Sequence, residues 1–158
     1  MSPPVEPRSA TDVPGEPGAG LLRASWWGTA LFAATAGPAV VVKAMEPVAF
    51  VVAIGLFVAG CGLFFAGYLR GIGRSRSEQV AVASLFLLAG SAPATMRRSL
   101  LGSLTAEVVV ALAVSIARPY TSLAAGALVP MYGLGICGLW AARHGKFPPA
   151  EPGRRQSR

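Results

Sequence analysis

The sequence PVAFVVAIGLFVAGCGLFFAGYL, from Pro47 to Leu69, runs for 23 residues without a charged side chain. An α-helix rises about 1.5 Å per residue and the hydrocarbon core of a bilayer is about 30 Å thick, so this stretch is long enough to cross a membrane. Three further stretches have the same character, and among them only Glu107 is charged: Ala24–Val42, Ser99–Ala117 and Thr121–Ala142. The sequence therefore predicts an all-α, polytopic integral membrane protein with four transmembrane helices in two hairpins.

The composition excludes an ordinary soluble domain. Hydrophobic residues make up 53% of the chain and charged residues 13%, whereas soluble domains carry about 25% charged residues. The net charge of +7 would suit nucleic acid in a soluble protein. Here the basic residues lie in clusters beside the apolar stretches, which is typical of cytoplasmic membrane loops. We therefore expect no nucleic-acid partner.

Three regions follow from the distribution of proline, glycine and charge. Residues 1–22 are rich in proline and lack apolar periodicity, so they are expected to be a disordered tail. Residues 23–146 form the transmembrane domain, and residues 147–158 form a disordered basic tail. The segment Ala24–Ala33, followed by Ala34-Thr35-Ala36, also matches a secretory signal with a small-residue cleavage site. Cleavage of the first span is therefore left open.

The segment Val80–Ala89 is too short to be a clear span. Ten residues make a helix of about 15 Å, which suits an interfacial or re-entrant helix, although a fifth span is the alternative. With four spans and both termini cytoplasmic, 12 of the 14 basic residues lie inside and only Lys43 and Arg118 outside. A fifth span would leave six inside and eight outside. The excess of cytoplasmic Lys and Arg in membrane proteins favours four spans in the plasma membrane.

Glu107 is the one ionisable side chain near the middle of a predicted span. An intramembrane carboxyl group is costly and is by default a candidate ion or proton site. The alternative is a hydrogen-bonded side chain that holds helices together. Its candidate partners are the hydroxyl-bearing residues Ser103, Thr105, Ser115 and Tyr132.

The basic residues beside the spans are candidate contacts for anionic lipid headgroups, because each Lys or Arg near a charged membrane surface contributes about 1 kcal/mol. The residues concerned are Arg70, Arg74, Arg76, Arg97, Arg98, Arg143 and Lys146. Arg70 to Ser77 is expected to be a basic cytoplasmic loop. On the outer side, Lys43 and Glu46 stand three residues apart and could pair.

Small residues four positions apart recur in three of the spans. Close backbone approach drives helix association in lipid, so these pairs predict helix contacts within the chain and, as a further option, a homo-oligomer. The pairs are Ala30 and Ala34, Ala33 and Gly37, Gly55 and Ala59, Gly62 and Ala66, and Gly133 and Cys137.

The inventory of reactive residues argues against an enzyme. The chain has one histidine, His144, and one aspartate, Asp12. Its remaining carboxylates near lipid lie at different depths, so no acid–base pair is expected. Cys61 and Cys137 fall inside spans, where they are expected to act as small packing residues. We predict no catalytic residue, no cofactor and no metal.

From Trp26 to Phe147 the chain resembles the small polytopic membrane proteins common in actinobacteria, a resemblance of composition and layout that implies no activity. We expect a non-enzymatic accessory or scaffold subunit whose basic loop and tails meet anionic lipids or a membrane-protein partner. The alternative is a small oligomeric transporter or channel that uses Glu107. Small multidrug transporters also have four helices and one membrane glutamate, but here the glutamate falls in the third span.

Overall fold

The computed structural model describes residues 18–75 and 82–146, and every regular element in these two ranges is helical. The five α-helices are α1 (Ala19–Val41), α2 (Glu46–Ser75), α3 (Val82–Phe86), α4 (Ala94–Ala117) and α5 (Pro130–His144). Two 3₁₀ helices, η1 (Lys43–Met45) and η2 (Ser122–Leu128), precede α2 and α5. The predicted disordered tails, 1–22 and 147–158, lie outside the described residues except for 18–22. For 19–22 the prediction is wrong, because α1 begins at Ala19, five residues before the predicted span.

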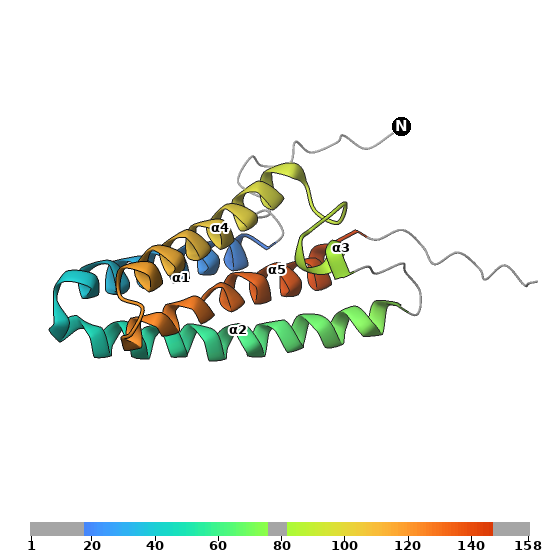
Figure 1. Ribbon diagram of the computed structural model, residues 1–158. Coiled ribbons are helices and arrows are strands. Elements are labelled where there is room, and N and C mark those ends of the chain that lie inside the picture. The colour runs from blue at the N-terminus through green and yellow to red at the C-terminus, as the bar shows by residue number, and fades with distance from the viewer. Residues whose placement is uncertain (1–17, 76–81, 147–158) are drawn as a thin grey trace, which may run out of the picture.

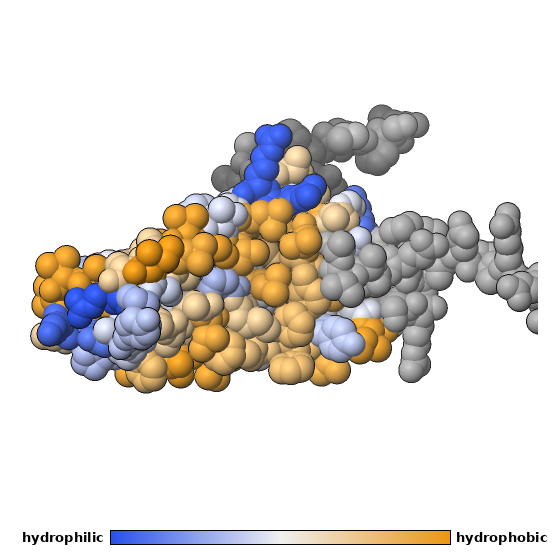
Figure 2. Space-filling model, viewed as in Figure 1, coloured by the Kyte–Doolittle hydropathy of each residue, from blue (hydrophilic) through white to orange (hydrophobic). Residues whose placement is uncertain are grey.

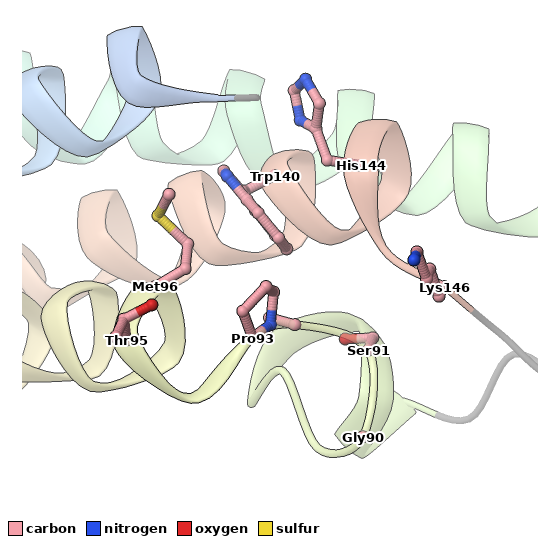
Figure 3. Close-up of a pocket in the computed structure, with 9 residues that line it drawn as sticks. Gly90, Ser91, Pro93, Thr95, Met96, Trp140, His144 and Lys146 are labelled. Atoms are coloured by element: carbon pink, nitrogen blue, oxygen red, sulfur yellow. The ribbon is translucent and has the colours of Figure 1, made fainter. Parts of the chain in front are cut away.

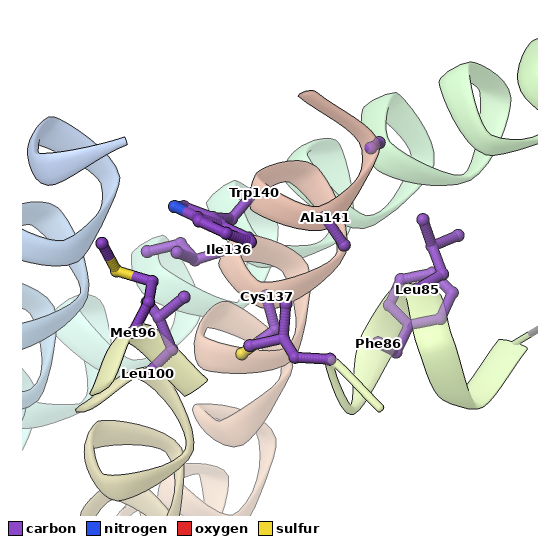
Figure 4. Close-up of a cluster of buried hydrophobic side chains, with 10 residues drawn as sticks. Leu85, Phe86, Met96, Leu100, Ile136, Cys137, Trp140 and Ala141 are labelled. Carbon is purple, nitrogen blue, oxygen red and sulfur yellow. The ribbon is translucent and has the colours of Figure 1, made fainter. Parts of the chain in front are cut away.

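The four long helices form an elongated bundle, in which α2 lies beside α5 and α1 lies beside α4 (Figure 1). Helix α5 is the most enclosed of them, because nine of its 15 residues are buried. Two apolar clusters fill the bundle. One surrounds Trp140 at the end near α3 (Figure 4), and the other surrounds Phe32 at the end near η2.

Among the residues that the structure describes, three helical segments are long and apolar enough to cross a membrane, namely Lys43–Gly73, Ala94–Ala117 and Ser122–His144. Helix α1 is not among them, because its first half carries polar and interfacial residues such as Ser25, Trp27 and Thr29. On the face shown in Figure 2 the middle of the bundle is mainly apolar, and the most hydrophilic residues lie at the end near η2 and beside the start of α4. These features suggest a membrane protein. The fourth span stays a prediction.

Helix α2 continues past the end expected from hydropathy. It runs to Ser75 instead of stopping near Leu69, so the prediction of a loop from Arg70 is wrong for its first six residues. Packing explains the extension. A Cβ atom on Gly71 would lie 2.9 Å from Leu85 Cδ2, so the bare backbone of this turn seats α3.

The last predicted span is divided. The expected helix Thr121–Ala142 consists of η2 followed by α5, and Pro130 is the first residue of α5 rather than an interior position. Proline lacks an N–H and its ring clashes with the carbonyl four residues earlier, so an α-helix cannot run through Pro130 without distortion. The 3₁₀ turns of η2 supply the remaining length.

The segment after α2 is a short packed helix. Helix α3 has five residues, about 7.5 Å of rise, so its described part cannot be a fifth span. The Phe86 ring stacks on Phe64 of α2 with centroids 4.4 Å apart, and fits against Gly138 of α5. The following Leu88 has φ 56° while its side chain is fully buried. Burial thus offsets the unfavourable left-handed backbone.

Glycines allow α2 and α5 to touch backbone to backbone. A Cβ on Gly135 would lie 2.5 Å from the carbonyl oxygen of Gly60, and one on Gly67 would lie 2.8 Å from the carbonyl carbon of Gly138. The small residues four positions apart, from which contacts were predicted in α2, are not the ones that meet α5. In α2, a Cβ added to Gly55 or Gly62 would meet nothing within 4 Å, so the predicted α2 pairs are wrong as contacts within the chain.

The same correction applies to α1. Ala30, Ala34 and Gly37 are exposed, and the buried small residues of this helix lie on another face. In α5 the prediction is confirmed, since Gly133 and Cys137 are both buried. Small residues are so common in this chain that spacing alone cannot tell the packed face from the outer face.

Replacing Gly135 by Ala should lower the free energy of unfolding by about 1–3 kcal/mol, because the new methyl group forces two backbones apart. Gly55→Ala is the matched control, and it should be neutral or slightly stabilising because its Cβ meets no neighbour. Unfolding by SDS in mixed micelles, followed by far-UV circular dichroism, measures both. Equal stabilities for the two variants would contradict the assigned contact.

Candidate functional site

Glu107 lies at the centre of the bundle, in α4, with its side chain fully buried. The Thr29 hydroxyl of α1 donates to its Oε1 at 3.0 Å, and the backbone N–H of Gly133 in α5 donates to its Oε2 at 3.1 Å. One carboxyl group therefore joins three helices. Both of its oxygens have a partner, as a buried polar group requires in a low-dielectric setting.

The Thr29–Glu107 bond is the innermost of three bonds between side chains of α1 and α4. Trp26 Nε1 donates to Ser99 Oγ at 3.1 Å, and the hydroxyl groups of Ser25 and Ser103 bond to each other. On α4 the three partners are spaced by four residues, so they share one face of the helix. We call this set, Trp26–Ser99, Ser25–Ser103 and Thr29–Glu107, the polar ladder.

Two glycines make room for this arrangement. A Cβ on Gly133 would lie 2.7 Å from Glu107 Oε2, so only glycine lets the carboxyl group reach the backbone of α5. A Cβ on Gly28 would lie 2.1 Å from the ring of Tyr132, whose hydroxyl donates to the carbonyl of Ala24 at 2.9 Å. Helix α5 is thereby joined to both α1 and α4.

The structure corrects the expected partners of Glu107. Ser103 bonds to Ser25, Thr105 bonds to the carbonyl of Leu101, and Tyr132 bonds to Ala24. The buried hydroxyl of Ser115 has no partner among the described residues. The partners that sequence reasoning missed are Thr29 and Gly133. One available signal was the four-residue spacing of Ser25 and Thr29, which places two hydroxyl groups on one face of α1.

Beyond Glu107 toward η2, the buried residues form an apolar cluster, and the hydroxyl of Ser115, which has no partner among the described residues, is also buried on this side. The cluster there contains Phe32, Val114, Leu123 and Val129 with several alanines. The polar ladder thus leads from one end of the bundle to Glu107 and continues no further among the described buried residues. Within the described ranges, no group of three His, Cys, Asp or Glu side chains could hold a metal ion. Cys61 and Cys137 are free thiols.

The candidate lipid contacts gather at the end of the bundle where α4 begins and α5 ends, which we call the cation-rich end. The described Lys and Arg side chains at this end are all exposed: Arg23, Arg70, Arg97, Arg98, Arg143 and Lys146. Arg74 lies in α2 without a described side chain, and Arg76 lies outside the described residues. In the described ranges the only carboxylates are Glu46 and Glu107, and neither lies at this end.

At the opposite end, hydrogen bonds hold the connections together. Glu46 Oε1 accepts from the backbone N–H of Ser122 at 3.1 Å and from its hydroxyl at 2.8 Å. Arg118 Nη1 donates to the carbonyl of Val40 at 3.0 Å. Glu46 therefore joins α2 to η2. The predicted ion pair between Lys43 and Glu46 is not found among the described residues.

Comparison with known proteins adds no relative: no protein-family model, curated protein sequence or solved structure matches this chain. The site therefore has to be interpreted from its own geometry.

Removing the Thr29 hydroxyl should weaken the bundle, because Glu107 Oε1 then loses its partner away from water. We expect Thr29→Val to lower the free energy of unfolding in micelles by about 1 kcal/mol. Thr105→Val is the matched control, since that hydroxyl bonds only within its own helix at an exposed position. In a double-mutant cycle with Glu107→Leu, which has no acceptor oxygen, purely additive effects would rule out the assigned Thr29–Glu107 bond.

Proposed function

We propose that this chain is a non-enzymatic integral membrane protein that serves as an accessory or scaffold subunit in the plasma membrane. It has four spans in two hairpins, α1 with α2 and α4 with α5, and both termini are cytoplasmic. Its cation-rich end meets anionic lipids and partner proteins on that side. The observation that carries the proposal is the gathering of exposed cations, with no described carboxylate among them, at one end of an apolar bundle.

Packing supports α1 as the fourth span. This helix has 23 residues, about 35 Å of rise, and lies along α4 within the bundle. Its polar residues Ser25 and Thr29 are buried against α4, whereas Trp27, Leu31 and Val41 point outward. A helix whose polar groups are satisfied inside the protein can face lipid despite its modest hydropathy.

The charge distribution supports the orientation. The cation-rich end holds six described basic side chains without a described carboxylate, while Lys43 and Arg118 are the described cations at the other end. Lys and Arg accumulate on the cytoplasmic side of membrane proteins. The connections at the other end are short, and hydrogen bonds from Arg118 to Val40 and from Ser122 to Glu46 hold them against the bundle. This leaves little surface for an external ligand.

The transporter alternative finds less support in the geometry. Glu107 is fully buried with both oxygens bonded, and beyond it the polar ladder gives way to an apolar cluster in which no further hydrogen-bonded side chain of the described residues continues the ladder. An ion pathway needs polar groups or water on both sides of its central site. A hydrogen bond that joins helices accounts for the same contacts without a pathway.

Proton flux into liposomes separates the two functions. We expect liposomes with the wild-type chain, and those with Glu107→Gln, to show the same flux as empty liposomes under an imposed pH gradient. Flux that is present in the wild type and lost in the Gln variant would establish the transporter and overturn the proposal.

Blue-native electrophoresis of gently solubilised native membranes tests the scaffold. The chain should migrate in an assembly larger than the purified protein forms alone, and Arg97→Gln with Arg98→Gln should release it. Lys43→Gln, which removes a charge from the opposite end, should leave the assembly intact. Migration of the native chain at the size of the purified protein would refute the scaffold function.

A further inference from the structure

The exposed cations of the cation-rich end have no described carboxylate beside them, because Glu46 and Glu107 lie elsewhere. Segment 1–17, which we call the acidic segment, holds three carboxylates and one basic residue, so its side chains carry a net charge of −2. Segment 76–81 is neutral and segment 147–158 carries +2. Among these three segments outside the described residues, the acidic segment therefore complements the charge of the cation-rich end. The carboxylates concerned are Glu6, Asp12 and Glu16.

The acidic segment joins the bundle at this same end. It is followed by Gly18, which has φ 87°, a left-handed backbone that suits glycine. A Cβ on Gly18 would lie 2.1 Å from Trp140 Nε1, so the backbone of Gly18 packs directly on the indole ring in α5. The chain therefore enters the described bundle beside the end of α5, near which Arg143 and Lys146 are exposed.

One cavity links this entry point to a cation. Trp140, His144 and Lys146 line a cavity of about 470 Å³ at the cation-rich end (Figure 3). The rings of Trp140 and His144 have centroids 5.6 Å apart. The backbone N–H of Lys146 donates to the carbonyl of Ser91 at 3.0 Å, which holds Lys146 against the loop before α4. Lys146 thus borders the same cavity as the ring on which Gly18 packs.

The acidic segment is long enough to reach the other cations. Neighbouring helices lie about 10 Å apart, so the end of a four-helix bundle is about 20 Å across. Glu16 precedes Gly18 by two residues, Asp12 by six and Glu6 by twelve. At up to about 3.6 Å per residue, Glu16 stays within about 7 Å of Gly18, whereas Asp12 reaches about 22 Å. The segment can therefore place carboxylates both beside α5 and beside the start of α4.

We propose that the acidic segment lies on the cation-rich end of its own chain and screens these cations from anionic lipids. Exposed ion pairs are weak one at a time, but tethering raises the local concentration of the segment to about the millimolar range. Such a contact forms at low ionic strength and yields to other anions. The contact within the chain stands independently of the proposed function, whereas the identity of the competitor as lipid rests on it.

Carbodiimide crosslinking of the full chain in nonionic detergent tests the contact, because it joins a carboxylate to an amine that touches it. The chain has two lysines, Lys146 at the cation-rich end and Lys43 at the opposite end. We expect peptides of the acidic segment joined to Lys146 and none joined to Lys43. The crosslink should disappear at about 0.5 M salt, where the screening length is shorter than about 5 Å.

Two controls identify the crosslink. Lys146→Arg keeps the positive charge but has no reactive amine, so it should abolish the crosslink. A mixture of isotope-labelled and unlabelled chains separates contacts within a chain from contacts between chains. Crosslinks of Lys146 to Glu78 or Glu151 alone, or crosslinks only between chains, would overturn the proposal.

Binding of short-chain phosphatidylglycerol, followed by native mass spectrometry of the full chain at low ionic strength, tests the screening. A segment that covers the cations about two thirds of the time lowers the apparent lipid affinity about threefold, because only the uncovered fraction binds. The triple variant Glu6→Gln, Asp12→Asn, Glu16→Gln should therefore bind this lipid about threefold more tightly than the wild type. Arg8→Gln, which makes the segment more negative, should weaken binding.

The two measurements keep this inference separate from the proposed function. An unchanged lipid affinity in the triple variant would overturn the screening even where Lys146 is crosslinked. If neither the wild type nor the triple variant prefers phosphatidylglycerol over zwitterionic phosphatidylcholine, the lipid contact of the proposed function fails. In that case a salt-sensitive crosslink to Lys146 would still support the contact within the chain.

Discussion

In a bilayer the lipid tails are as apolar as the side chains they surround, so the hydrophobic effect contributes little to helix association. A bundle must therefore be held by close contact and by buried hydrogen bonds. Here the backbone contact between α2 and α5 is the interaction on which the other elements depend. Gly60 and Gly135 let the two helices touch. This contact makes α5 the central helix, with nine buried residues. Helix α3 then packs on the surface that the pair creates, through Phe64 and Phe86.

The polar ladder holds the second pair of helices by different means. Its three bonds join α1 to α4, and the carboxyl group of Glu107 extends the connection to α5 through Gly133. A polar group that is satisfied in only one packing arrangement fixes rotation and register as well as adding stability. Apolar contacts between similar small side chains discriminate less between one rotation and another. The ladder thus explains how a chain rich in alanine, glycine and valine can adopt one arrangement.

The long helices could be predicted from the sequence because length and the absence of charge are local properties. Pro47 lies in the first turn of α2, at the start of the uncharged stretch, whereas Pro130, an interior position of the expected helix Thr121–Ala142, is the first residue of α5 and divides that span. Contacts were harder to predict. The bond between Thr29 and Glu107 depends on how α1 is rotated against α4, and the choice of Gly60 over Gly55 depends on which face meets α5. Leu88 illustrates the same limit, since its left-handed backbone is stabilised by burial that arises only after the bundle assembles.

The order of the partners of Glu107 along the chain also matters while the protein is being made. Thr29 precedes it by 78 residues, whereas Gly133 follows it by 26. When α4 leaves the ribosome, the hydroxyl of α1 already exists but the amide of α5 does not. The bond between α1 and α4 can therefore form during synthesis before α5 exists, whereas the enclosure of Glu107 is complete only once α5 has been added.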